Sequence, residues 1–93
     1  MDSYSIFATE EFDKKFAKLS KDRQKFIENK ISEFLVPQLQ VEPHFGNNIK
    51  KLRGYDNNTY RYRIGNFRIF YQIDEDKKDI ALLTIAPRKD AYK

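Results

Sequence analysis

The stretch TYRYRIGNFRIFYQI, from Thr59 to Ile73, decides how this chain folds. Its pattern predicts two strands joined at Gly65-Asn66, because a two-residue hairpin loop with glycine first suits a type II′ turn. Such a turn fixes the register of the strands when Ile64 and Phe67 flank it. The residues then expected to face each other are Arg63 and Arg68, Tyr62 and Ile69, Arg61 and Phe70, and Tyr60 and Tyr71.

This register separates the side chains onto two faces of the hairpin. One face is apolar and aromatic and needs a cover; it carries Tyr60, Tyr62, Ile64, Phe67, Ile69 and Tyr71. The other carries Arg61, Arg63, Arg68 and Phe70. Two arginines directly opposite each other repel, whereas converging guanidinium groups suit a phosphate, which each can bind through two hydrogen bonds. We therefore interpret this face as an anion site; the alternative is a solvated face on which the arginines splay apart.

The composition indicates one globular domain over residues 1–93. The chain has 40% hydrophobic and 15% aromatic residues, enough for one core but not two. With no Cys and a single histidine, His44, disulfides, cysteine nucleophiles, zinc hydrolysis and two-histidine RNA cleavage are excluded, and we expect neither metal nor cofactor. The chain lacks the pattern of a signal peptide and any stretch that could span a bilayer, which favours a cytoplasmic protein.

Positive charge is concentrated in the second half of the chain. Residues 1–49 hold seven Lys/Arg and eight Asp/Glu, a net charge of −1. Residues 50–93 hold eleven Lys/Arg and six Asp/Glu, a net charge of +5. A basic half of this kind indicates a polyanion or an acidic protein as the partner.

The first half predicts a short strand and two helices. Tyr4 to Ala8 is prone to form a strand, and Thr9 is the expected N-cap of a helix that runs to about Leu19. Ser20 begins a second helix, which we expect to weaken or end at Val36-Pro37. Its apolar positions, which we assign to the core that covers the hairpin, are Phe26, Ile27, Ile31, Phe34 and Leu35.

The remaining segments complete an α+β fold. Pro43 to Asn48 is a loop in which His44 has no assigned role, and Ile49 to Gly54 is a basic approach to the sheet. Asp74 to Lys78 is a charged turn, although three consecutive acids could also hold a hard cation. Asp79 to Ile85 is an apolar strand that ends at Ala86-Pro87. We thus expect β-α-α-β-β-β, with about four strands, antiparallel except for the N-terminal one, packed on an N-terminal helical hairpin.

Three segments together resemble a known group of proteins. KLRG at residues 51–54, YRYRIGNFRIFYQI, and an apolar strand that ends in APRKDAY are similar in type, order and spacing to the RelE branch of the RelE/ParE toxin superfamily. The resemblance implies a toxin of a type II toxin–antitoxin system that cuts messenger RNA in the ribosomal A site. The reaction it implies is attack by the RNA's own 2′-hydroxyl, without metal.

The resemblance also assigns the site residues. The implied catalytic set is Arg61, Arg63, Arg68, Arg88 and Tyr92, and the implied RNA-binding set is Lys50, Lys51, Arg53, Phe70 and Lys89. The best-known relatives carry lysines where this chain has Arg61 and Arg63, and arginine is too basic to accept a proton. Tyr92 and Lys89 are therefore the candidate bases, unless the rate depends mainly on electrostatics and ribosomal positioning.

Two other functions remain open from the sequence: a DNA gyrase inhibitor of the ParE type and a non-catalytic RNA-binding module. The partners that the resemblance implies are an antitoxin, the ribosome and its messenger RNA. We expect no membrane contact, and a toxin–antitoxin complex that is a higher-order hetero-oligomer. An acidic or amphipathic antitoxin segment would complement the basic half.

Overall fold

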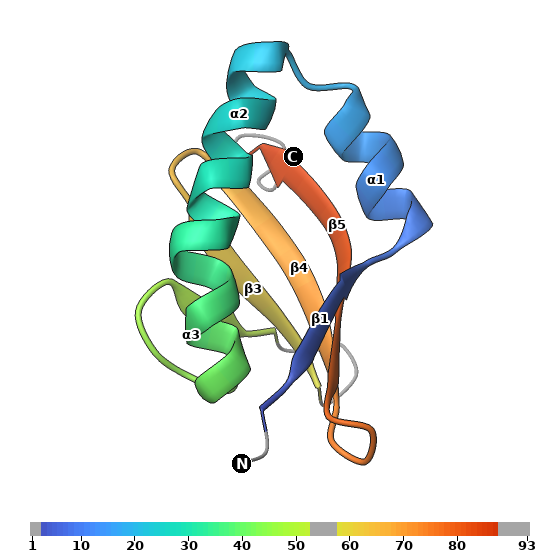
Figure 1. Cartoon of the computed structure of the whole chain (residues 1–93), viewed down its shortest axis with the longest axis vertical. Helices are drawn as coiled ribbons and strands as arrows, with labels where there is room; N and C mark the ends of the chain where they lie inside the picture. Colours follow the sequence, from blue (N-terminus) through green and yellow to red (C-terminus); the bar gives the residue numbers. More distant parts are fainter. Residues whose placement is uncertain (1–2, 53–57, 88–93) are drawn as a thin grey trace.

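The computed structural model describes residues 3–52 and 58–87 and shows a mixed sheet with helices packed on one face (Figure 1). The sheet order is β1-β5-β4-β3-β2, with β1 parallel to β5 and the other pairs antiparallel. The elements are β1 Ser5–Ala8, α1 Glu10–Ala17, α2 Lys21–Lys30, a π-helical turn Ile31–Leu35, α3 Val36–Val41, β2 Ile49–Lys51, β3 Thr59–Ile64, β4 Phe67–Asp74 and β5 Asp79–Pro87. The predicted α+β fold is confirmed, and the basic approach adds a fifth strand, β2.

The β3–β4 hairpin has the predicted turn and register. Ile64 pairs with Phe67, Arg63 with Arg68, and each pair beyond them follows as expected. Gly65 has a φ of +54° whereas Asn66 has no positive φ, which is the type II′ pattern. The turn therefore determines which side chains of both strands face the helices.

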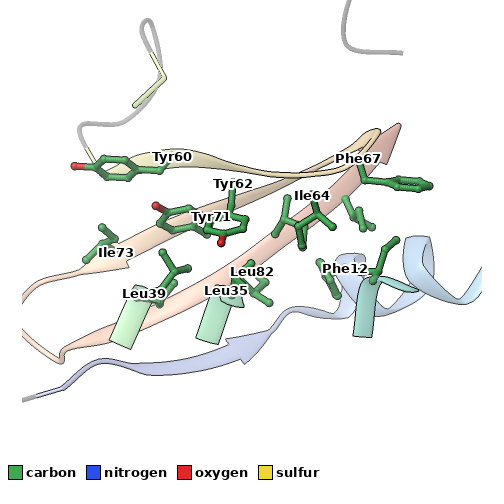
Figure 2. Packing of buried hydrophobic residues seen from close by; sticks show 14 of the residues in the cluster. Phe12, Leu35, Leu39, Tyr60, Tyr62, Ile64, Phe67, Tyr71, Ile73 and Leu82 are labelled. Atoms are coloured by element: carbon green, nitrogen blue, oxygen red, sulfur yellow. The ribbon is translucent and has the colours of Figure 1, made fainter. Parts of the chain in front are cut away.

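The predicted aromatic face of the hairpin forms the core. Tyr62, Ile69 and Tyr71 are almost completely buried. Figure 2 shows the two tyrosines packed near side chains from the helices, including Leu35 and Leu39. The buried tyrosines keep hydrogen-bond partners: the Tyr62 hydroxyl donates to Gln38 Oε1 at 2.8 Å, and the Tyr71 hydroxyl donates to a loop carbonyl at 2.7 Å. The core thus combines apolar burial with satisfied hydroxyl groups.

Of the two outcomes predicted at Val36-Pro37, the second helix does not end there, but its regular hydrogen bonding is interrupted just before it. A π-helical turn, Ile31–Leu35, precedes α3, and the Val36 N–H donates to the Ile31 carbonyl five residues earlier. A proline ring inside a regular helix clashes with the carbonyl four residues before it. The wider π turn gives the Pro37 ring room, so the helix continues to Val41.

The assignment of Phe26 and Phe34 to the core is wrong, and the same turn explains the exposure of Phe34. Leu35 is fully buried, whereas Phe34 is 54% exposed and Phe26 is 42% exposed. The extra residue in the π turn rotates the helix face, so Leu35 takes the core position and Phe34 points away. Phe26 instead lies against the hairpin turn, where a Cβ atom on Gly65 would be 3.2 Å from its ring.

Thr9 joins the first helix to an irregularity in β5. Its Oγ1 accepts from the Phe12 N–H at 3.2 Å, which confirms the predicted N-cap. The register of β4 and β5 shifts beside Phe70, and the same Oγ1 lies 3.0 and 2.9 Å from the carbonyl oxygens of Leu82 and Leu83. One hydroxyl therefore fixes the start of α1 on the sheet.

The sequence predicted that His44 is an incidental loop residue, but the structure gives it two carboxylate partners. Its Nδ1 lies 2.7 Å from Glu42 Oε2, and its Nε2 contacts Glu75 Oε2 in the turn between β4 and β5. The rings of Tyr4 and Tyr60 pack edge-on against the imidazole. His44 thus ties the loop after α3 to a turn that is distant in sequence.

This contact changes the pKa of all three charged groups. The hydrogen bond that the imidazole donates to Glu75 raises the pKa of His44, although partial burial opposes the change. The hydrogen bond from His44 lowers the pKa of both Glu42 and Glu75. The charged forms of all three residues are therefore favoured in the folded protein.

Among the described residues, the structure contains no helix that is long and apolar enough to cross a membrane.

We predict that Thr9→Ala destabilises the protein more than Ser20→Ala does. Each substitution removes an N-cap, which lowers the free energy of unfolding by about 0.5–2 kcal/mol. Thr9→Ala also removes the hydroxyl donor beside two carbonyls of β5, which lowers it by about 1 kcal/mol more. Ser20 is the matched control because its side chain caps α2 in the same way. Urea unfolding of both variants measures the difference, and equal losses would contradict a role for the β5 contacts.

We predict that the stabilising effect of His44 depends on pH. Because its folded-state pKa is raised, its contribution is complete below the unfolded pKa of about 6.5 and is lost as pH rises through the folded value. The lowered carboxyl pKa values have the opposite effect, so their contribution is lost as pH falls below about 4.

His44→Gln should therefore lower the free energy of unfolding by about 0.5–1 kcal/mol at about pH 6, and by less at about pH 3 and about pH 9. Thermal unfolding of the wild type and the variant at the three pH values tests this. A difference that stays constant across them would show that His44 acts only through packing.

Candidate nucleic-acid interface

The face of the sheet opposite the helices aligns the predicted basic residues in two cross-strand rows. One row runs from Lys50 on β2 through Arg61 and Phe70 to Thr84 on β5. The next row contains Arg63, Arg68 and Ala86. Strand pairing alone therefore brings three arginines and an aromatic ring together.

Arg63 and Arg68 form the closest pair on this face. The backbone N–H of Arg63 points away from β4 and donates to the Asn48 carbonyl at 2.9 Å. Arg63 and Arg68 therefore form a cross-strand pair whose backbones do not hydrogen-bond to each other. The Cα atoms of such a pair are only about 4.5 Å apart. Two cations that start this close can bind the same phosphate group.

Arg61 and Phe70 face each other in the adjacent row, and both are half-buried. This places a guanidinium group and an aromatic ring two residues along the strands from the Arg63–Arg68 pair. An aromatic ring can stack on a base while neighbouring cations bind the sugar–phosphate backbone. The arrangement is therefore suited to single-stranded RNA.

The structure separates the two lysines of β2. Lys50 pairs with Arg61 and shares its face, whereas Lys51 pairs with Tyr60 and so belongs to the face that the helices cover. The other predicted site residues lie outside the described residues: Arg53, Arg88, Lys89 and Tyr92. Their position relative to the arginine rows is therefore not described.

The charge of this face changes sign along β4, which carries Arg68, then Phe70 and Gln72, and ends at Asp74. A hollow of about 450 Å³ at the acidic end is lined by Phe7 and several carboxylates. Asp74 Oδ1 accepts from the N–H groups of the two residues after Glu75, both at 3.1 Å, which confirms the predicted turn. A polyanion would be attracted to the arginine end and repelled from the acidic end.

The sequence did not indicate a second hollow, at the edge of the sheet beside Arg63. It has a volume of about 270 Å³ and is lined by Lys30, Phe34, Asn48, Tyr62, Arg63, Ile64 and Gly65. We call it the Phe34 groove. The sequence pattern concealed it because Phe34 falls on the apolar side of a regular helix, and only the π turn moves it to the surface.

Comparison with known proteins identifies the family and the fold. Residues 6–92 match a protein family described as "ParE toxin of type II toxin-antitoxin system, parDE". The chain belongs to this family. It is therefore a type II toxin of the RelE/ParE superfamily, which confirms the superfamily predicted from its motifs. A search of curated proteins finds no significant match.

Solved structures of RelE toxins have the same fold as this superfamily member. The RelBE2 toxin–antitoxin complex of Mycobacterium tuberculosis contains a chain with a TM-score of 0.71 and 22% identity, covering 92% of this chain and 99% of that one. The archaeal RelE–RelB complex of Pyrococcus horikoshii contains a chain with a TM-score of 0.68 and 24% identity, covering 92% of this chain and 96% of that one. The RelB–RelE complex of Methanococcus jannaschii contains a chain with a TM-score of 0.64 and 26% identity, covering 94% of this chain and 95% of that one.

We predict that Arg63→Glu stabilises the toxin while weakening its binding to RNA. The substitution replaces a like-charge pair opposite Arg68 with an opposite-charge pair, worth about 0.2–1 kcal/mol, and removes a cation from the proposed phosphate site. Arg23→Glu, on the exposed surface of α2, is the control for net charge. Thermal unfolding and titration of a labelled single-stranded RNA measure the two effects, and a loss of stability would disprove the predicted repulsion.

Proposed function

We propose that this toxin is a ribosome-dependent endoribonuclease that cleaves messenger RNA in the A site and so inhibits translation in the cytoplasm. The observation that carries the proposal is the pairing of Arg63 with Arg68, beside Arg61 and Phe70, on one face of the sheet. Guanidinium groups that converge on one place suit a phosphate that develops negative charge, because each can bind its oxygens through two hydrogen bonds.

The proposed reaction is a phosphoryl transfer within the RNA. The 2′-hydroxyl attacks the adjacent phosphorus, the bond to the 5′-oxygen breaks, and the products are a 2′,3′-cyclic phosphate and a 5′-hydroxyl. Arg61, Arg63 and Arg68 stabilise the charge that accumulates on the phosphate oxygens, and Phe70 stacks on a neighbouring base. Correct alignment of the 2′-hydroxyl supplies much of the rate, because the attack needs an in-line geometry.

The proton transfers need groups other than these arginines, which remain protonated. We assign Arg88 to support the leaving 5′-oxygen, and Tyr92 to base stacking or proton transfer with Lys89 as the other candidate base. These assignments rest on the match between the APRKDAY segment and the RelE pattern. With so weak a set of bases, the toxin depends on the ribosome to position the message and cleaves free RNA slowly.

The remaining basic residues hold the RNA strand, and an antitoxin controls the activity. Lys50, Arg53 and Lys89 provide contacts to phosphates around the site, whereas Lys51, on the opposite face of β2, takes no part in it. The three relatives described above were each solved as a complex of RelE with RelB. We propose that this toxin is likewise neutralised by a cognate antitoxin, in a higher-order hetero-oligomer.

A DNA gyrase inhibitor is the second candidate function. The observation that favours it is the match of residues 6–92 to the ParE toxin family. The arginine rows favour the ribonuclease instead, because inhibition of a protein target does not require converging cations around an aromatic ring.

Expression of the wild type beside Arg63→Ala and Arg88→Ala, with Arg23→Ala as a control, distinguishes the two functions. We expect translation-dependent cleavage within codons, detected by primer extension, and at least about a tenfold loss in the two site variants because each removes a charge-stabilising contact. Arg23→Ala should cleave like the wild type, since its side chain lies on the exposed surface of α2.

Growth arrest with intact message and altered plasmid supercoiling would replace the ribonuclease with the gyrase inhibitor. Fast digestion of free RNA by the pure protein would disprove the dependence on the ribosome. Equal activity of the wild type and Arg63→Ala would remove the arginine pair from the mechanism.

A further inference from the structure

We propose that the Phe34 groove is a docking site for an apolar, acidic segment of the neutralising antitoxin, and that docking draws Arg63 away from the RNA face. The proposal rests on the proposed function and deepens it, because it names the surface that the partner binds and how binding inhibits. It is carried by three independent features of the groove: exposed aromatic rings, a rigid wall and a purely cationic charge.

The first feature is an aromatic surface that the fold leaves exposed. Phe34 and Phe26 lie on either side of Lys30, whose Nζ is 5.0 Å from the centroid of the Phe34 ring and 5.7 Å from that of Phe26. Both rings are about half exposed, so the fold leaves part of their apolar surface in contact with water, which is unfavourable. A surface of this kind is typical of a site that another protein covers.

The π-helical turn shows that this exposure has a specific structural cause. Without the extra residue, the helical pattern would direct Phe34 towards the sheet together with Leu35. Single π turns within helices occur frequently at functional sites. Here the turn supplies a large apolar side chain to the groove and keeps Leu35 in the core.

The second feature is the rigid opposite wall of the groove, formed by the end of the β3–β4 hairpin. Figure 1 shows this turn beside α2, and the Phe26 ring lies so close to Gly65 that a Cβ atom there would be 3.2 Å from it. The ladder between β2 and β3 ends at Tyr62, so Arg63 and Ile64 extend past it. The groove is thus held open between two fixed elements, and binding requires little ordering of the toxin.

The third feature is the charge of the groove. Within the described part of the chain, its lining contains two cations, Lys30 and Arg63, and no acidic residue. The occupant should therefore combine a large apolar side chain with neighbouring carboxylates. A nucleobase fits less well, because Lys30 already lies over the Phe34 ring and the aromatic surface continues along the helix to Phe26.

Arg63 connects the groove to the proposed catalytic face. It lines the groove, and it also stands opposite Arg68 in the second arginine row. A carboxylate bound in the groove would pair with the Arg63 guanidinium at the sheet edge and draw it away from the phosphate site. The antitoxin could therefore inhibit without covering the whole RNA face.

The test uses two groove variants with matched controls. The probe is the purified product of the gene adjacent to that of the toxin. Phe34→Ala is compared with Phe7→Ala, whose ring is similarly exposed at 51% but lies on β1 across the sheet, and Lys30→Glu with Lys25→Glu on the same helix. We expect the dissociation constant to rise at least about tenfold for the groove variants and less than about twofold for the controls.

Co-expression adds a readout that does not depend on how the toxin acts. The groove variants should still arrest growth when their antitoxin is present, whereas the control variants should be neutralised. This outcome would support the docking site even if the toxin proved to inhibit gyrase. Thermal unfolding of each variant confirms that all four remain folded.

Three outcomes would overturn the proposal. Unchanged affinity of both groove variants would place the antitoxin elsewhere on the toxin. Unchanged affinity with reduced ribosomal cleavage by Phe34→Ala would make the groove an RNA subsite. Absence of any complex with the wild type would remove the partner, while primer extension would still decide the ribonuclease activity separately.

Discussion

The two-residue turn at Gly65 is the constraint on which the rest of this structure depends. Successive side chains of a strand point to opposite faces, so a shift of one residue at the turn would exchange the two faces of the hairpin. Tyr62 and Tyr71 would move to solvent, and Arg63 and Arg68 would move beneath the helices. The same turn therefore fixes the hydrophobic core and the basic face, and neither can be altered independently.

The two faces of the hairpin meet opposite requirements. The tyrosine face stabilises the fold by apolar burial and by hydroxyl groups that retain partners, such as Tyr71 with the Pro43 carbonyl. The arginine face places two like charges, Arg63 and Arg68, opposite each other, a pairing that by itself is unfavourable. Because the strands are central in the sheet, burial on one side can offset repulsion on the other. A small toxin that has no Cys can in this way hold converging cations without disulfides.

Sequence could predict the features whose determinants are local. The type II′ turn, the hairpin register and the Thr9 cap each follow from a few neighbouring residues, and the rows of described arginines follow from that register. Three features escaped prediction because their causes are not in the pattern. Phe34 is exposed through a change in helical hydrogen bonding, the partners of His44 come from two separate segments, and the strand character of β2 depends on pairing with β3.

The parallel pairing of β1 with β5 has a consequence for how the toxin is made. Ser5 pairs with Asp79, and Thr9 reaches β5 carbonyls, so the first strand and the start of α1 have no sheet to join until most of the chain has been synthesised. Contacts between such distant segments slow folding, because the chain entropy of closing the loop is lost before the contacts stabilise it. The nascent toxin therefore cannot complete its sheet until β5 has been synthesised.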